Sequence, residues 1–175
     1  MEDHFRKAEL VAIIERPGME IRLKALVSFL YLTGARVSEV VKVVRKYQIE
    51  LNNINGVPFL IVNDVPIEKR RIKMSRNIPI NIQREKPFVD VLLKYISLLN
   101  DEDILFDIKR SRAFQLVQKA TGKGPHFLRH SRLTALAVDY GFDSFDLQRF
   151  TGWASNKTAE SYIHKNFSDI ANKMT

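Results

Sequence analysis

The fold of this chain is decided by a stretch in its last third, which reads His126-Phe127-Leu128-Arg129-His130-Ser131. The stretch follows a Gly-Pro joint and opens an apolar segment of helical pattern that Gly141 closes. His126 and Arg129 are three positions apart, so they share one face at the start of this predicted helix. Because a helix N-terminus carries partial positive charge, the arrangement favours a bound anion such as a phosphate.

Two further motifs lie upstream and downstream of this stretch. Upstream, Thr33-Gly34 breaks an apolar helix, and Arg36 and Glu39 follow in a second, short helix. Downstream, Gly152-Trp153 precedes Tyr162, and the tryptophan and the tyrosine are nine positions apart. The chain thus combines two arginines, a histidine, an indole N–H and a phenol. Such a set suits attack on a phosphodiester, because the planar fork of arginine can bind two phosphate oxygens at once.

Tyr162 is the predicted nucleophile. It lies among small polar residues, whereas Tyr31, Tyr95 and Tyr140 lie in apolar helical patterns and are predicted to belong to the core. Tyr47 falls at a joint between a helix and a strand. Because a phenol is mostly protonated at neutral pH, attack requires cations that favour the phenolate or a base that takes its proton.

In these three motifs the chain resembles the catalytic domain of the tyrosine recombinases, the integrase family. In that family the first arginine lies in a motif of the form T-G-x-R-x-S-E and the second in H-x-L-R-H-[ST]. The nucleophilic tyrosine follows a histidine or tryptophan by nine positions. The resemblance extends from about residue 8 to about residue 172. It implies a mostly α-helical catalytic domain with a small antiparallel β-sheet, and a 3′-phosphotyrosyl bond to DNA with a free 5′-hydroxyl.

The resemblance also implies a role for each motif residue. Arg36 and Arg129 would hold the phosphate, and His126 would accept the tyrosine proton or hydrogen-bond the phosphate. Trp153 would donate its indole N–H to a phosphate oxygen. With a lysine as general acid, the predicted catalytic residues are Arg36, Lys73, His126, Arg129, Trp153 and Tyr162.

The general acid is a lysine that the family places on a turn between two strands, before a pattern of the form R-x-[IV]-P-[IL]. The segment that starts at Arg76 fits that pattern, and a basic cluster precedes it. Alignment without gaps places Arg71 at the lysine position, but an arginine does not readily release a proton. Lys73 is chosen because it lies nearest to the turn, and Lys69 is the alternative.

Two other polar residues are expected to support the site. Glu39 follows Arg36 by one helical turn, so it could orient a side chain of the site. A simple ion pair on the helix surface would give the same spacing. His130 is expected to be buried or to act as a hydrogen-bonded support.

Composition indicates a polyanionic partner and argues against thiol or metal chemistry. The chain has 28 Lys+Arg against 20 Asp+Glu, a net charge of +8 and a pI near 9.8. A lysine-rich solubilising surface would produce the same excess. The chain contains no cysteine and four scattered histidines, so a dedicated metal site is not expected. The mechanism that the resemblance implies also needs no cofactor, because the phosphotyrosine conserves the bond energy. Backbone contacts with DNA are predicted for Arg71, Arg76, Arg112 and Lys123.

Periodicity predicts a mostly helical domain with one small sheet. Helices are expected over residues 5–15, 21–32, 36–44, 87–99, 112–121, 127–140, 146–150, 157–163 and 168–174, the last with Ser168 as N-cap. Strands are expected over 48–51, 57–62 and 77–82, and Pro79 indicates that the last is an edge strand. Residues 1–175 are expected to form a single catalytic domain without the N-terminal DNA-clamping domain that family members usually carry.

The favoured hypothesis is a site-specific recombinase that cleaves and rejoins DNA through Tyr162. The alternatives are a type IB topoisomerase-like enzyme, a DNA-binding regulator that kept the fold without catalysis, and an unrelated helical nucleic-acid-binding protein. Expected partners are double-stranded DNA and other copies of the chain, from dimer to tetramer in synapsis. No membrane partner and no small-molecule substrate are expected, and the protein is placed in the cytoplasm with the nucleoid. The C-terminal tail docks either on a neighbouring copy or on its own domain.

Overall fold

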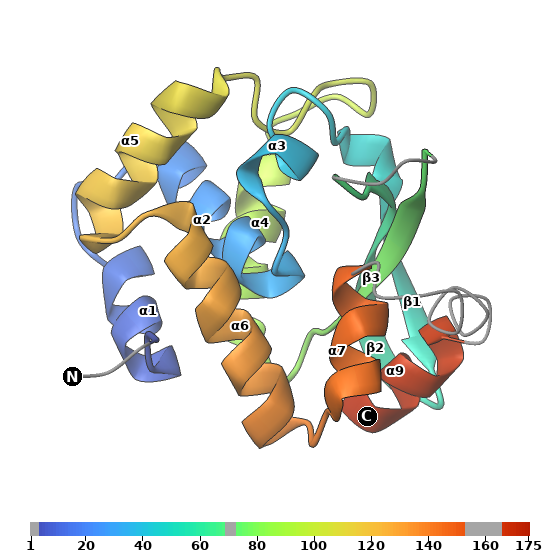
Figure 1. Ribbon diagram of the computed structural model, residues 1–175. Helices are drawn as coiled ribbons and strands as arrows, with labels where there is room; N and C mark the ends of the chain where they lie inside the picture. The colour runs from blue at the N-terminus through green and yellow to red at the C-terminus, as the bar shows by residue number, and fades with distance from the viewer. Residues whose placement is uncertain (1–3, 69–72, 153–165) are drawn as a thin grey trace.

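The protein folds around one buried helix, α2 (Ile21–Thr33), which lies at the centre of the helical part of the molecule (Figure 1). The computed structural model describes residues 4–68, 73–152 and 166–175. Every residue of α2 from Ala25 to Thr33 is buried. A helix that is apolar on all sides must be covered on all sides, and α2 packs mainly against α4 (Lys86–Ile96) and α6 (Pro125–Asp139).

The remaining helices surround this centre. They are α1 (Lys7–Ile14), α3 (Val37–Val40), the 3-10 turn η1 (Lys46–Gln48), α5 (Arg110–Thr121), α7 (Ser144–Thr151) and α9 (Asn166–Met174). α1 and α5 also contact α2, whereas α9 packs on α7 and on the sheet. The backbone carbonyl of Met174 accepts a hydrogen bond of 2.8 Å from the side-chain amide of Asn81, so the C-terminal helix packs on its own domain. None of the described helices is long and apolar enough to cross a membrane.

An antiparallel sheet of three strands, in the order β1-β2-β3, forms the other part of the molecule. The strands are β1 (Ile49–Ile54), β2 (Val57–Pro66) and β3 (Ser75–Asn81). Asn55 and Gly56 both have positive φ, as a two-residue hairpin turn requires. Pro79 pairs with Ile61 from an edge strand, as predicted, where its missing N–H disturbs no second neighbour.

The predicted fold class is confirmed, but most element boundaries differ by one to four residues, and three of the differences have a clear physical cause. The helix expected over residues 36–44 ends at Val40, because the backbone beyond it pairs with an extended segment: Lys42 N–H donates to Phe106 and Leu105 N–H donates to Val44. β1 runs to Ile54 rather than residue 51, because the turn is the tight Asn55-Gly56 pair. β2 continues past residue 62 through an irregularity before Val65 and reaches Pro66.

Two local predictions at polar residues were also wrong. Ser168 is not the N-cap of the last helix, because α9 begins at Asn166. His130 is exposed rather than buried, because it lies on the side of α6 that faces away from α2. The predicted core tyrosines Tyr31, Tyr95 and Tyr140 are all buried. The helix expected over residues 157–163 lies outside the described residues.

Candidate active site

The break between α2 and α3 places Arg36 beside α6. Gly34 closes α2 in the left-handed conformation, with φ of 60°. The hydroxyl of Thr33 donates to Phe29 in the preceding turn and accepts a hydrogen bond of 3.2 Å from the Ala35 amide. Arg36 has extended backbone angles and precedes the first residue of α3. The Thr-Gly pair therefore turns the chain sharply enough for Arg36 to reach the same hollow as residues of α6.

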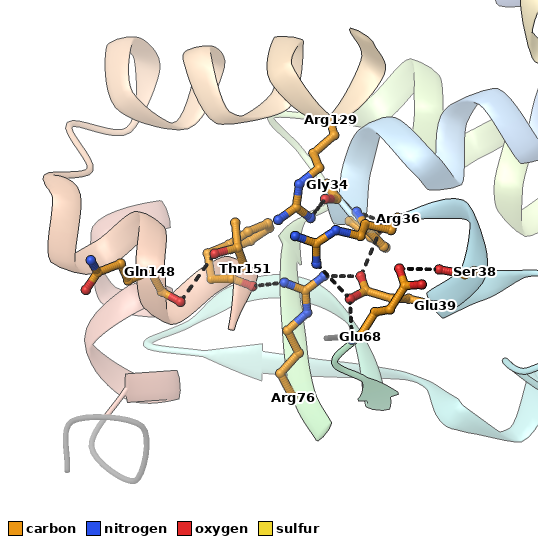
Figure 2. Close-up of polar contacts among 12 residues, drawn as sticks. Gly34, Arg36, Ser38, Glu39, Glu68, Arg76, Arg129, Gln148 and Thr151 are labelled. Atoms are coloured by element: carbon orange, nitrogen blue, oxygen red, sulfur yellow. Dashed lines mark hydrogen bonds and ion pairs between the residues drawn. The ribbon is translucent and has the colours of Figure 1, made fainter. Parts of the chain in front are cut away.

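Arg129 lies on α6 and lines the same hollow as Arg36. The motif that contains Arg129 therefore lies beside the motif that contains Arg36. Arg129 is 3 % exposed, and its Nη1 donates to the backbone carbonyl of Gly34 (Figure 2). Burial lowers the pKa of Arg129 to about 10, and the nearby Arg36 guanidinium acts in the same direction while Glu39 opposes it. The two predicted arginines thus lie close enough to repel each other.

Glu39 is the buried anion of this cluster. It is 1 % exposed, and its carboxylate lies 3.4 Å from Arg36 Nη1 and 3.5 Å from Arg76 Nη2 (Figure 2). It also accepts backbone hydrogen bonds of 3.0 Å from Arg36 and 2.9 Å from Glu68. Glu39 is therefore not an ion pair on the helix surface. Its contacts with Arg76 and with the backbone N–H of Glu68 connect α3 to β3 and to the segment that follows β2.

Arg76 supplies a third guanidinium, which is buried rather than exposed at the protein surface, and its predicted contact with DNA stays a prediction. The residue is 8 % exposed, and its Nη1 donates a hydrogen bond of 2.6 Å to the backbone carbonyl of Phe150, near the end of α7. Burial lowers the pKa of Arg76 to about 10, opposed by Glu39 and assisted by Arg129 and Arg36. Its side chain points inward because β3 alternates, and the even-numbered positions 76, 78 and 80 are all buried.

A second buried arginine cluster fixes α6. Arg132 is fully buried, its Nε donates to the Leu32 carbonyl at 3.1 Å and its Nη1 lies 2.9 Å from the Glu85 carboxylate. Glu85 also accepts a hydrogen bond of 2.6 Å from the Tyr140 hydroxyl and lies 2.9 Å from Lys7 Nζ. These contacts tie α6 to α2, α1 and the start of α4, and they hold the helix that carries His126 and Arg129.

The predicted residues Arg36, His126 and Arg129 line one hollow of about 930 Å³, here called the central hollow. His126 is exposed at the start of α6. Arg110 and Phe114 of α5 line the opposite wall, and Glu68 also reaches the hollow. Sequence reasoning did not place Glu68 or Phe114 in the site. The signal for the α5 wall was the one-turn spacing from Arg110 to Phe114, which puts both on one helix face.

The remaining predicted residues fall in three places. Lys73 is exposed just before β3. Arg112 lies on the face of α5 opposite Arg110 and lines a separate, lateral hollow with Arg16, Arg22 and Lys119. Lys123 Nζ lies 5.3 Å from the centroid of the Phe127 ring, at the start of α6.

Three of the predicted residues, Arg71, Trp153 and Tyr162, lie outside the described residues, as does the alternative acid Lys69. The structure therefore brings together Arg36, Glu39, His126 and Arg129 and leaves the nucleophile and the general acid as predictions. Within the described ranges, no group of three His, Cys, Asp or Glu side chains could hold a metal ion.

Comparison with known proteins gives one family and several similar structures. The model of the phage integrase family matches residues 3–169. The chain is 26 % identical over 182 aligned positions to tyrosine recombinase XerD of Staphylococcus saprophyticus, covering 93 % of this chain and 58 % of that protein.

Three solved structures share the fold at lower identity. The XerH site-specific recombinase, described as bound to difH substrate in a pre-cleavage complex, matches 100 % of this chain and 54 % of its own with a TM-score of 0.63 and 19 % identity. XerA recombinase matches 94 % of this chain and 66 % of its own, with a TM-score of 0.60 and 22 % identity. The integrase of mycobacterium phage Brujita matches 95 % and 56 %, with a TM-score of 0.59 and 15 % identity. The chain thus spans little more than half the length of most of these relatives.

Proposed function

Because the chain belongs to the phage integrase family, we propose that it is the catalytic domain of a site-specific recombinase, which cleaves and rejoins DNA strands through Tyr162. The observation that carries the proposal is the convergence of Arg36, His126 and Arg129 on the central hollow. Burial and the neighbouring Arg36 both lower the pKa of Arg129, so the site disfavours its positive charge. A DNA phosphate in the hollow would be the anion that these cations bind.

In the proposed reaction, Arg36 and Arg129 bind the non-bridging oxygens of the scissile phosphate. The phenolic oxygen of Tyr162 attacks phosphorus, the bond to the 5′ oxygen breaks, and a 3′-phosphotyrosyl bond forms. His126 takes the phenol proton or holds a phosphate oxygen, and Trp153 donates its indole N–H. Lys73, or alternatively Lys69, gives a proton to the departing 5′ oxygen. Attack of a 5′-hydroxyl on the phosphotyrosine reverses the step and rejoins a strand.

Double-stranded DNA is the proposed partner, together with further copies of the chain for strand exchange. The net charge of +8 and the basic hollows support a polyanionic partner. A protein that acts on chromosomal or mobile DNA is expected in the cytoplasm, with the nucleoid.

Covalent trapping tests the proposal. The protein is incubated in EDTA with a duplex that carries a 5′-bridging phosphorothiolate, and an SDS-resistant adduct is sought. We expect an adduct with the wild type and with Tyr47→Phe, which alters an exposed tyrosine outside the site, and none with Tyr162→Phe.

The outcome also separates the alternative functions. An adduct without strand exchange between two sites, but with relaxation of supercoiled DNA, would support the topoisomerase-like alternative. Salt-sensitive DNA binding with no adduct would support the DNA-binding regulator.

A further inference from the structure

The end of α7 is held against the β2–β3 hairpin by two contacts. The first is the hydrogen bond from Arg76 Nη1 to the carbonyl of Phe150. The second is the packing of Gly152 against Ile67. A Cβ at position 152 would lie 2.5 Å from Ile67 Cδ1, so any larger residue would force the Ile67 side chain to shift. Gly152 also has φ of +74°, which other residues rarely adopt.

These contacts join the two segments that carry the proposed nucleophile and the proposed acid. Ile67 and Arg76 lie on either side of the turn that contains Lys69 and Lys73. Phe150 and Gly152 directly precede the segment that contains Trp153 and Tyr162. The four residues that make these contacts, Ile67, Arg76, Phe150 and Gly152, all lie within the described residues.

The Arg76 contact is suited to holding a helix end. The Phe150 carbonyl is among the last of α7, where helix carbonyls lack partners within the helix and attract cations. A hydrogen bond from a charged group is stronger than one between neutral groups, and this one is buried. Arg76 Nη2 also lies 3.5 Å from Glu39, so the same guanidinium connects the end of α7 to the cluster of Arg36, Glu39 and Arg129.

We propose that Arg76 and Gly152 are positioning residues that clamp the tyrosine-bearing segment to the β2–β3 hairpin. The inference rests on the proposed function. Displacement at phosphorus needs the attacking and leaving oxygens roughly in line. The nucleophile and the acid must therefore keep a fixed relation across the phosphate. A misplacement of about 1 Å can slow such a reaction by about 10²-fold.

The first test replaces Arg76 by Gln and by Lys and measures the rate of adduct formation at saturating DNA, the affinity for DNA and the thermal midpoint. We expect Arg76→Gln to slow adduct formation by about 10²-fold while affinity stays within about twofold. Arg76→Lys should recover part of the rate, because it keeps a cation near the Phe150 carbonyl. Equal loss of affinity and rate would overturn the clamp.

Two substrates then show which segment Arg76 positions. With ordinary DNA the leaving 5′ oxygen needs a proton, whereas the thiolate of a 5′-phosphorothiolate leaves without one. We expect Arg76→Gln to be slow on both, because the tyrosine segment is displaced. Full recovery on the phosphorothiolate would show that Arg76 serves the acid alone and would contradict the clamp.

The second test uses Gly152→Ala. We expect a slow variant that Ile67→Ala, in the double mutant, partly restores by removing the clash. Gly141→Ala is the matched control, because Gly141 also has positive φ, of +68°, but has no atom within 4 Å of a Cβ. Equal rates for the two glycine variants would mean that backbone strain alone, and not contact with Ile67, slows the enzyme.

Hydrogen exchange gives a readout that does not need catalysis. The amide of Gly152 donates a hydrogen bond of 2.8 Å to Gln148 at the end of α7. In Arg76→Gln we expect this amide to exchange at least about tenfold faster, with the amides of α6 unchanged. If the wild type forms no adduct but this amide still exchanges faster in Arg76→Gln, the clamp is kept and the proposed function is rejected. Unchanged exchange and rate in the variants would reject the clamp alone.

Discussion

Arg129 and Arg132 lie one helical turn apart on α6, and both are buried, but their surroundings differ in charge balance. Burial alone would lower the pKa of Arg132, but the guanidinium forms an ion pair with the Glu85 carboxylate, and this pair raises the pKa. Around Arg129, the neighbours include Arg36, and burial together with this cation lowers the pKa. A cluster whose charges balance serves as scaffold, whereas one with more guanidinium groups than carboxylates among the described residues favours an anionic ligand.

The largest effect should come from breaking the balanced cluster. Arg132→Met leaves Glu85 buried without its guanidinium, so we expect a loss of about 3–5 kcal/mol in the free energy of unfolding. Urea unfolding measures it. Arg84→Met is the control, because Arg84 stacks on Tyr140 from the exposed side, 3.8 Å from the ring centroid. An equal loss in both variants would show that contact with Tyr140, and not the buried charge pair, carries the stability.

The unbalanced cluster should respond in the opposite way. Arg129→Gln is expected to slow adduct formation by about 10²–10³-fold, the effect of removing one donor to a developing oxyanion. The free energy of unfolding should change by less than about 1.5 kcal/mol, because the variant loses the hydrogen bond to Gly34 but also a buried like charge. A loss of stability as large as that of Arg132→Met would remove the distinction between the two arginines.

Acid should weaken the balanced cluster specifically. Burial alone would raise the pKa of Glu85, but Arg132, Lys7 and the Tyr140 hydroxyl lower it from 4.5 to about 2. As pH falls below about 4.5, the unfolded chain takes up this proton first, so stability present at neutral pH is lost between about pH 4.5 and 2. The loss should be roughly 3 kcal/mol.

Unfolding curves across this range test the assignment. Glu85→Gln should lose this part of the pH dependence, starting from a lower stability. If the variant kept the wild-type slope, other carboxyl groups would be responsible for the acid sensitivity.

The smallest effect concerns cations that belong to neither cluster. The side chains of Arg112 and Lys119 are exposed in the lateral hollow and make no hydrogen bond or ion pair with the residues that the structure describes. If both touch DNA phosphates, Arg112→Gln with Lys119→Gln should reduce the slope of log K against log salt concentration by about 0.9 per lost contact. Adduct formation at saturating DNA should not change.

Lys86→Gln with Lys94→Gln is the control, because these exposed lysines on α4 line neither hollow. Equal slope changes in the two double variants would mean that net charge, and not the lateral hollow, governs binding.

Much of this molecule was predictable where the determinant was local. The Thr33-Gly34 break and the one-turn spacing of His126 and Arg129 depend only on backbone geometry within a few residues, and both appear as expected. Pro79 identified the edge strand because proline lacks the N–H that an inner strand would need. Prediction failed beyond Val40, where pairing with the segment at Phe106 overrode helical continuation.

The sequence by itself determined the family, the fold class and the order of the motifs, because local spacing and periodicity express them directly. Only the tertiary structure decided which cations are structural. Arg76, read as a DNA contact, and Arg132, hidden in an apolar helix, are both buried. Their partners lie 37 to 100 positions away in sequence, at Glu39, Phe150, Glu85 and Leu32. The role of a charged side chain depends on the charges packed around it, and those neighbours are assembled only when the chain folds.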